Sequence, residues 1–537
     1  MARGRDLDLF EGRGRGGFRR RPRRNSAALT ALFRLAALGV LGAIVVAGVI
    51  VFMRRSQASL DVDMRVLWAP GVAAVSAIEG PDGEALQVVA GATIIGPDGA
   101  AATTNADGDA RLSFEAPATL VVEAPGFHSG TFQVTEVDLG PERALYLQID
   151  PIVLDGRVLD ENGNGIKEAT VRLGERVTTT EEFGSFEFVA AVPGTIAVEK
   201  AAWEPAEMEW DGSNGRLDVI LEPFLVRGLR VGADAAGTPA TFQALLEIAD
   251  TTAVNALVFD TKQEYGTVMY DSQVAEAREI GAVEVLYDVE AVLAAAKEHD
   301  LYTITRIVTF QDAIRGPARP EHAIRDATTG DLWVNDAGIT WMDPTDRGAW
   351  EYPIALAVEA CEFGFDEIQF DYVRFPTDGD VSNTQYDVPV DETVRIETIR
   401  GFLTEARRQI HQAGCAVSAD IFAIVLSVPD DQGLGQMPED LSFAVDAISP
   451  MIYPSHYGPG WLGFDNPNDF PEEVVEQAVD AGMPRMVGGA VLRPWLQAFG
   501  YDADQVRAGI DVAEERDLGW LLWNAFSDFS AGGIPPE

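Results

Sequence analysis

Short apolar runs alternate with longer amphipathic stretches throughout the chain after Phe224. The runs have the length of buried strands, and the stretches carry apolar residues at the three- and four-residue spacing of helices. We predict eight strands, over residues 225–231, 254–260, 302–310, 366–375, 416–422, 446–453, 484–491 and 519–524. Eight strand–helix units in a segment of this length predict a (β/α)8 TIM barrel. A doubly wound open sheet is the alternative, although no glycine-rich phosphate-binding motif follows the first strand.

A different pattern fills residues 80–223, where apolar and polar residues alternate in short runs broken by Gly, Asn, Asp and Pro. Such alternation predicts small antiparallel strands with one buried face. Two stretches of this region align with each other, because a glycine, a proline and an aromatic residue recur at a constant offset of 76 residues, as Gly108 and Gly184 do. We therefore predict two copies of one small β-sandwich, over residues 80–150 and 151–223.

One uncharged apolar segment lies near the N-terminus, at residues 35–53. Its 19 residues are long enough to span the hydrocarbon of a bilayer as a transmembrane helix. Ten arginines precede the segment and two follow it, so the positive-inside rule places residues 1–34, an Arg/Gly-rich tail, in the cytoplasm. We expect a single-pass protein of the cell membrane whose later domains, joined by a linker over 54–79, are extracytoplasmic. A cleaved signal peptide is the alternative, but its apolar core would be shorter.

The charge of the chain is strongly negative and unevenly spread. Among 537 residues, 40 basic and 85 acidic side chains give a net charge of −45. Because 12 of the arginines and only three of the acids lie in residues 1–55, the remainder carries a net charge of −54. Such a body repels nucleic acid, so we expect no nucleic-acid partner for it. The acidity either keeps the protein soluble in a salt-rich setting or selects a cationic or neutral substrate.

Polar residues end several of the predicted barrel strands, where the active sites of such barrels lie. Asp371 closes the fourth strand and Asp420 the fifth, each on the face opposite its apolar neighbours and therefore toward the barrel axis. Two carboxyl groups on adjacent strands have the geometry of glycoside hydrolysis, in which one is a protonated acid and the other an ionised nucleophile or base. A helix N-cap or a buried ion pair is the other interpretation of each aspartate.

Further residues at strand ends and in the following loops are candidates for binding a sugar. Aromatic faces stack on sugar rings while polar groups bind the hydroxyls, although loop aromatics also pack beneath long loops, and the arginines also suit ion pairs with the aspartates. The candidates are Asp260, Arg306, Arg374, Tyr453, His456, Trp461, Trp523 and Asn524.

The sequence gives little support for metal or serine-nucleophile chemistry. The five histidines lack the spacing of metal ligands, and no Gly-x-Ser-x-Gly motif occurs. We therefore expect no resident metal and no other cofactor, while a cation held by carboxylates alone stays open. The two cysteines, Cys361 and Cys415, either form one disulfide or remain buried thiols.

Several motifs resemble, in order, those of a bacterial family classed with the glycoside hydrolases and formerly a domain of unknown function. They include DEIQFDYVRFPTDGD, VSADIFAIVLSVPDDQGLGQ, DAISPMIYPSHYGPG and GWLLWNA. The resemblance implies a TIM barrel over 224–530 in a surface or secreted protein that hydrolyses polysaccharide. It also implies that Asp371, in QFDYVRFP, is the nucleophile or base and that Asp420, in SADIF, is the acid.

The second β repeat, with LDGRVLDENGNGIKEATVRL, resembles the carboxypeptidase regulatory-like β-sandwiches, and the first repeat does so more loosely. That resemblance implies stalks or ligand-binding spacers. Together these features predict a membrane-anchored extracytoplasmic glycoside hydrolase that acts on a cell-wall or extracellular polysaccharide. A non-catalytic surface protein that binds glycan or organises the cell envelope is the alternative.

Overall fold

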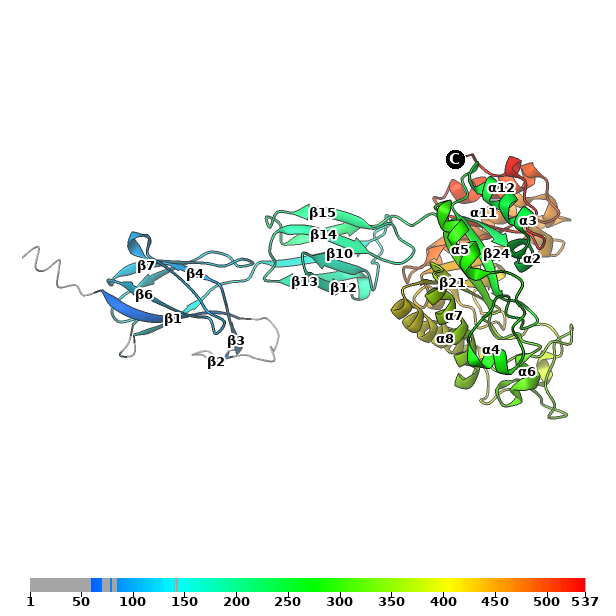
Figure 1. Ribbon diagram of the computed structural model, residues 1–537, viewed down its shortest axis with the longest axis horizontal. Coiled ribbons are helices and arrows are strands. Elements are labelled where there is room, and N and C mark those ends of the chain that lie inside the picture. The colour runs from blue at the N-terminus through cyan, green and yellow to red at the C-terminus, as the bar shows by residue number, and fades with distance from the viewer. Residues whose placement is uncertain (1–58, 70–77, 80–84, 140, 142, 537) are drawn as a thin grey trace, which may run out of the picture. The chain divides into compact units, whose positions relative to one another are not determined.

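The structure of the protein is a computed structural model that describes residues 59–69, 78–79, 85–139, 141 and 143–536 (Figure 1). By its internal contacts the chain divides into two units, Met1–Asp150 and Pro151–Glu537. The predicted cytoplasmic tail and transmembrane helix lie outside the described residues. No helix in the described part of the chain is long and apolar enough to cross a membrane.

The first unit holds a β domain made of two sheets around one apolar core. One sheet has the order β2 (Ile78–Glu79), β3 (Ala85–Val88), β1 (Leu60–Trp68), β6 (Asp109–Phe114), with β9 (Ala144–Gln148) paired to β1. The other has the order β5 (Ala101–Thr103), β4 (Thr93–Ile95), β7 (Ala118–Glu123), β8 (Gly130–Val134). Strand β1 lies inside the predicted linker 54–79, so that prediction was wrong for these residues. Charged residues at its outward positions make this strand resemble a linker in the sequence, although its buried residues, such as Val62 and Met64, fill the core.

The second β domain repeats the same architecture at the start of the second unit. One sheet has the order β13 (Ser185–Val189), β10 (Val153–Leu159), β16 (Arg216–Ile220), and the other β12 (Arg176–Thr179), β11 (Thr170–Leu173), β14 (Gly194–Glu199), β15 (Ala206–Trp210). Strand β10 pairs antiparallel with β13 and parallel with β16, as β1 does with β6 and β9. Buried Thr104 and Thr180 also form equivalent hydrogen bonds in the two domains. The two domains are therefore structural copies.

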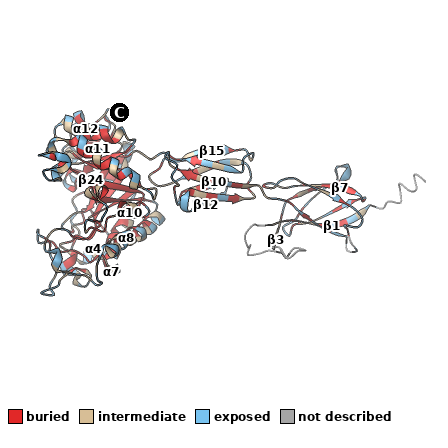
Figure 2. Ribbon diagram, turned by 180° about the vertical axis from the view of Figure 1, so that it is seen from behind, coloured by how far each residue is buried: buried red, intermediate tan, exposed pale blue. Residues whose placement is uncertain are grey.

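The remainder of the second unit is a closed barrel of parallel strands, as predicted. Its strands are β17 (Arg227–Val231), β18 (Ala256–Lys262), β19 (Tyr302–Val308), β21 (Glu367–Asp371), β23 (Ala416–Phe422), β24 (Ala447–Ile452), the pair β25 (Val491–Leu492) and β26 (Trp495–Gln497), and β27 (Trp520–Trp523). Hydrogen bonds between β23 and β24 close the ring. Figure 2 shows that buried residues concentrate on these strands and on the helix faces that cover them.

The seventh strand differs most from its predicted position, 484–491. Residues Met483–Arg485 form a 3-10 turn, and Gly489 has a φ of 87° that interrupts extended backbone. The strand then runs in two pieces, β25 and β26, that both pair with β24. Pro494 separates the pieces because proline has no N–H to donate to the ladder.

Helices lie between the barrel strands along the chain. They are α2 (Ala233–Gly237), α3 (Pro239–Ala249), α4 (Ala275–Glu279), α5 (Val289–Glu298), α6 (Arg315–Ala318), α7 (Arg347–Phe363), α8 (Glu392–Ala413), α9 (Ile424–Ser427), α10 (Pro438–Leu441), α11 (Pro471–Gly482) and α12 (Ala503–Glu514). Aspartates cap four of the longer helices by accepting a hydrogen bond from a first-turn N–H, at Asp288, Asp346, Asp391 and Asp502.

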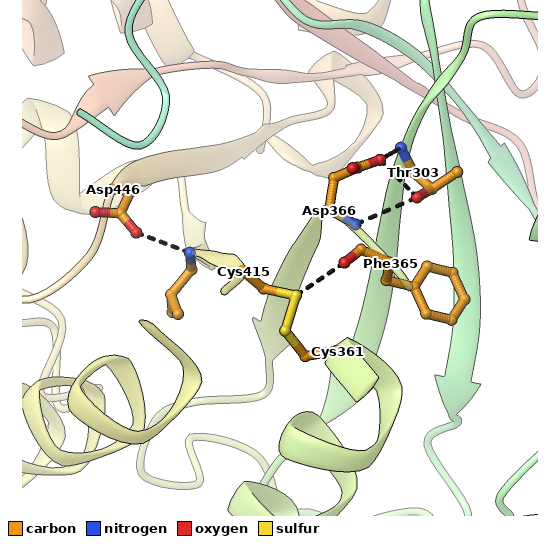
Figure 3. Close-up of a disulfide and its surroundings, with 7 residues drawn as sticks. Thr303, Cys361, Phe365, Asp366, Cys415 and Asp446 are labelled. Atoms are coloured by element: carbon orange, nitrogen blue, oxygen red, sulfur yellow. Dashed lines mark hydrogen bonds between the residues drawn. A yellow bond between two sulfur atoms is a disulfide. The ribbon is translucent and has the colours of Figure 1, made fainter. Parts of the chain in front are cut away.

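Cys361 and Cys415 form a disulfide (Figure 3), which decides between the two alternatives that the sequence left open. The bridge joins the last turn of α7 to the residue before β23, and both cysteines are buried. It closes a loop of 54 residues. Removing that much loop entropy from the unfolded chain stabilises the fold by about 4 kcal/mol.

A buried ionic cluster joins the second β domain to the barrel within the second unit. Asp446, directly before β24, accepts a hydrogen bond from Arg407 Nε at 3.0 Å, and Lys200 Nζ of the β domain lies 3.6 Å from it. His411 Nε2 lies 2.7 Å from the same carboxylate. Burial opposes ionisation of Asp446, but Arg407, His411 and Lys200 outweigh it and hold its pKa below the usual range. Trp203 completes the contact by donating its indole N–H to the Gly489 carbonyl at 3.2 Å.

Candidate active site

A pocket of about 540 Å³ opens where the barrel strands end. Active sites of TIM barrels lie at this end. The pocket is lined by Glu264, Arg306, Asp371, Tyr372, Arg374, Asp420, Phe422, Ala423, Ile424, Met451, Tyr453, His456, Tyr457, Gly458, Trp461, Trp495 and Trp523. The structure thus brings together eight of the ten site residues predicted from the sequence, and places Asp260 and Asn524 outside the pocket lining.

The two candidate catalytic aspartates sit side by side because of strand register. Phe370 of β21 pairs with Ala419 of β23, so the next residues along the strands, Asp371 and Asp420, occupy neighbouring positions. Phe370 and Ala419 pack into the core between barrel and helices. The alternation of a strand then turns both aspartates toward the barrel interior, as the sequence pattern indicates.

Arg306 of β19 is the centre of the charge network at the pocket. Its Nε and Nη2 donate to Asp371 Oδ2 at 2.8 and 2.6 Å, and Nη2 also donates to Glu264 Oε1 at 2.6 Å. Its Nη1 donates to Asp260 Oδ1 at 3.3 Å. Burial disfavours this guanidinium, yet the surrounding carboxylates raise its pKa well above the usual value. A permanent cation therefore contacts three carboxylates at once.

Asp371 is held firmly in one orientation. While Oδ2 accepts from Arg306, Oδ1 accepts the backbone N–H of Tyr372 at 2.6 Å. Tyr372 has a φ of 49°, a left-handed conformation that costs energy for a residue other than glycine. That turn ends strand β21 at Asp371, four residues before the predicted end at Phe375, and directs the chain around the pocket.

Asp420 has a contrasting environment. Its side chain is 1% exposed, and the indole N–H of Trp495 donates to Oδ1 at 2.8 Å. Burial, reinforced by the nearby charge of Asp371, raises the pKa of Asp420 well above its usual value. Adjacent carboxyl groups with such different surroundings are suited to opposite acid–base roles.

Glu264 is a pocket carboxylate that the sequence analysis missed. Burial opposes its ionisation, but the charge and hydrogen bond of Arg306 hold its pKa at about 2. It follows β18, which continues to Lys262 rather than ending at Asp260 as predicted. The run DTKQEYG shows no alternation of polar and apolar residues that would predict an inward side chain for Glu264. Only the position of Glu264 just beyond a strand end indicates a role in the pocket.

The two predicted residues outside the pocket lining have structural contacts. Asp260 is buried and accepts from Arg230 Nη2 at 2.5 Å as well as from Arg306. Asn524 accepts the backbone N–H of Phe526 at 2.9 Å through its side chain. Its carbonyl accepts from Arg230 at 3.3 Å. These contacts brace the network beside the pocket.

Aromatic rings form much of the pocket wall. Trp523 meets Trp495 edge to face at 5.3 Å between ring centroids, and Tyr457 lies 5.0 Å from Trp461. The Tyr457 hydroxyl and the Trp461 indole nitrogen are buried without a hydrogen-bond partner in the described structure. Burial also lowers the pKa of His456, so this ring is neutral near pH 7. The wall is thus apolar faces with a few polar edges, as sugar-binding sites require.

Several lining residues escaped sequence analysis. Trp495 did so because the seventh strand was placed too early, and Tyr372 because the fourth was extended past its true end. The rest lie in the last residues of β23 and β24 or in the segments that directly follow these strands: Phe422, Ala423, Ile424, Met451, Tyr457 and Gly458. No group of three or more potential metal ligands occurs among the described residues.

A family model described as "Putative glycosyl hydrolase domain" matches residues 228–529. No curated protein matches the chain. A hypothetical protein from Ruminiclostridium thermocellum is 35% identical, with a TM-score of 0.33, over 36% of this chain and 96% of that one. The glycoside hydrolase domain of PgaB (BpsB) from Bordetella bronchiseptica is 14% identical, with a TM-score of 0.44, over 57% and 95%.

The glycoside hydrolase domain of PelA from Pseudomonas aeruginosa is 10% identical, with a TM-score of 0.35, over 57% of this chain and 97% of that one. These structural likenesses are weak, whereas the family match spans more than half of the chain and nearly the entire barrel. The barrel is a glycoside hydrolase domain, and the chain belongs to the family described as "Putative glycosyl hydrolase domain".

Proposed function

We propose that the barrel hydrolyses glycosidic bonds of a polysaccharide with Asp420 as general acid and Asp371 as nucleophile or base. The observation that carries this assignment is the unequal environment of two neighbouring carboxyl groups at one pocket. Burial raises the pKa of Asp420, whereas Asp371 accepts charge-assisted hydrogen bonds from Arg306. Glycoside hydrolysis requires one protonated and one ionised carboxyl group.

The proposed reaction begins when Asp420 donates its proton to the glycosidic oxygen as the bond to the anomeric carbon breaks. Asp371 either attacks that carbon, forming a glycosyl ester that water deprotonated by Asp420 then hydrolyses, or removes a proton from the water that attacks the carbon directly. Arg306 orients Asp371 throughout. The indole N–H of Trp495, already bonded to Asp420 at 2.8 Å, stabilises the carboxylate that remains after proton transfer.

We further propose that the enzyme is anchored in the cell membrane by residues 35–53 and acts outside the cytoplasm. The arginine flanks of that segment support this orientation. The Cys361–Cys415 disulfide also supports it, since such bridges persist in oxidising compartments. The two β domains, which we assign to the carboxypeptidase regulatory-like modules, would serve as spacers before the barrel.

Asp371→Asn and Asp420→Asn test the assignment of the two carboxyl groups. Each should lower reducing-end release from the responsive polysaccharide by about 100-fold or more, because general acid–base groups contribute factors of this size. A panel of purified polysaccharides identifies that substrate, and Asp504→Asn, an exposed position on α12, is the matched control with unchanged activity.

Full activity in either active-site variant would contradict the mechanism. If the wild-type chain binds glycans but releases sugar from none, and both variants bind equally well, the alternative of a non-catalytic glycan-binding surface protein replaces it. Circular dichroism and thermal unfolding of each variant show whether a loss reflects chemistry or misfolding.

A further inference from the structure

Arg374 is a buried cation of the pocket that the proposed mechanism does not use. It follows Asp371 by three residues, lines the pocket and is 6% exposed. Aromatic rings surround its guanidinium, with the centroids of Phe422, Trp341 and Tyr372 at 4.6, 4.9 and 5.2 Å. Burial lowers its pKa, but an arginine remains charged at neutral pH.

The other charged side chains of the site contact one another, two arginines against three carboxylates. Arg306 contacts Asp260, Glu264 and Asp371, and Arg230 contacts Asp260. Burial raises the pKa of Asp420 well above its usual value and so disfavours its charged form. In the described part of the chain, Arg374 forms no direct ion pair, and the charges of Asp371 and Asp378 act on it only from beyond contact distance. A buried charge without a direct partner is costly, and cation–π contacts offset only part of the cost.

One edge of this guanidinium is also free. Its hydrogen bonds, to the Phe375 carbonyl at 3.0 Å and to Thr377 Oγ1 at 3.4 Å, both come from Nη1. The Nε and Nη2 groups donate to no described residue, and neither is among the enclosed polar atoms that lack a partner. They are therefore not fully enclosed, in a residue that lines the pocket. Nε–H and Nη2–H form the planar fork that binds the two oxygens of a carboxylate.

We propose that Arg374 binds the carboxylate of a uronic acid unit, so that the polysaccharide cleaved by this enzyme is acidic. The inference rests on the proposed function, because it places the acidic sugar beside Asp371 and Asp420. A neutral sugar hydroxyl would satisfy one N–H of the fork and leave the guanidinium without a direct ion-pair partner. A carboxylate satisfies both N–H groups and supplies that partner beside the rings of Tyr372 and Phe422.

Equilibrium binding tests the proposal without requiring turnover. The probes are short oligosaccharides of galacturonate, mannuronate and glucuronate, each paired with its carboxyl-reduced neutral counterpart, and an O-sulfated neutral oligosaccharide. Calorimetric titration uses the full chain carrying Asp371→Asn, so that no probe is cleaved. At least one uronate should bind about 10-fold or more tightly than its neutral counterpart, the usual gain from hydrogen bonds to a charged group.

Adding Arg374→Gln should remove that preference, whereas Arg374→Lys should retain part of it because the ammonium keeps the charge but lacks the fork. Arg347→Gln is the matched control. Arg347 also lies over an aromatic ring, Trp350 at 3.9 Å, but at the start of α7 and outside the pocket lining. It should leave the preference unchanged. If Arg374→Gln fails to fold, the reduced preference of Arg374→Lys decides the question.

The proposal is overturned if no uronate binds more tightly than its neutral counterpart, if the preference survives Arg374→Gln, or if only the sulfated probe depends on Arg374. Sugar release by the wild-type chain is measured separately. If the wild-type chain releases sugar from a neutral polysaccharide and Arg374→Gln leaves that release unchanged, the proposed hydrolase function stands and the uronate assignment is wrong. If uronate binds through Arg374 but the wild-type chain releases no sugar, the assignment of the ligand stands and the hydrolase mechanism is wrong.

Discussion

At the scale of single residues, two aspartates acquire different chemistry from their neighbours. Asp371 accepts hydrogen bonds from the Arg306 guanidinium and a backbone N–H. Asp420 is enclosed, with the Trp495 indole as its side-chain donor. Burial therefore decides the protonation of Asp420, and Arg306 decides the orientation of Asp371. Activity should require Asp420 to be protonated, so it is lost as the pH rises through the raised pKa of this group.

Trp495→Phe tests this relation through the pH profile. The indole hydrogen bond favours the ionised form of Asp420, so its removal raises the pKa of Asp420 further. The basic limb of kcat/KM should then move to higher pH. Trp523→Phe is the control, since Trp523 lines the same pocket without a hydrogen bond to either aspartate, and its limb should not move. A basic limb that stays in place or moves to lower pH in Trp495→Phe would contradict the assignment of Asp420.

Sequence reasoning located these aspartates because strand alternation and position at a strand end are local properties. Strand alternation did not distinguish their roles, since both occur in similar polar–apolar patterns, and only the family resemblance assigned Asp371 as nucleophile or base and Asp420 as acid. Glu264 and Trp495 were missed for a related reason. Each lies where the predicted strand boundary was wrong, and boundaries depend on backbone features such as the left-handed Tyr372 and the Pro494 interruption.

At the scale of elements, buried ionic contacts link parts of the chain that are distant in sequence. Asp446, before β24, brings together Lys200 of the second β domain and Arg407 of α8. Arg407 Nη1 also donates to Glu168 of the β domain at 2.7 Å. The apolar core of the β domain extends to Ala447 and Val491 of the barrel. The second β domain and the barrel should therefore unfold as one cooperative unit.

Asp446→Asn should lower the free energy of unfolding of that unit by about 3 to 5 kcal/mol, because it leaves Lys200 and Arg407 buried without their shared counter-ion. Chemical denaturation measures the change. Asp440→Asn is the control, since the Asp440–Arg400 pair is partly exposed to solvent and should contribute less than about 1 kcal/mol. Equal, small effects of the two substitutions would show that the cluster is not a stabilising contact.

At the scale of the whole molecule, charge and hydropathy divide the chain into a basic N-terminal part and an acidic remainder. The acidity extends over β domains and barrel alike, so it describes solubility rather than the pocket, where positive and negative side chains are nearly balanced. An acidic surface also repels an acidic polymer at long range, so recognition of a uronate depends on short-range contacts such as that of Arg374.

The anchoring proposal predicts where the chain is found after cell fractionation. The full chain should sediment with membranes and resist extraction by high salt, because a 19-residue apolar helix inserts stably. A chain that begins at residue 56 should be soluble and retain its activity per molecule, because the barrel lies entirely beyond that point. A salt-extractable full chain would favour peripheral attachment, and a full chain in the soluble fraction would contradict the anchor.

The sequence by itself determined the β repeats, the barrel and the two candidate catalytic aspartates, because periodicity, internal repetition and strand ends can be recognised in short stretches of sequence. Only the tertiary structure decided that the cysteines pair, that β1 completes the first β domain and that Asp420 is enclosed while Asp371 meets Arg306. It also revealed that Arg374 has no direct ion-pair partner among the described residues. These properties depend on contacts between residues far apart in sequence, and burial and charge compensation exist only once those contacts form.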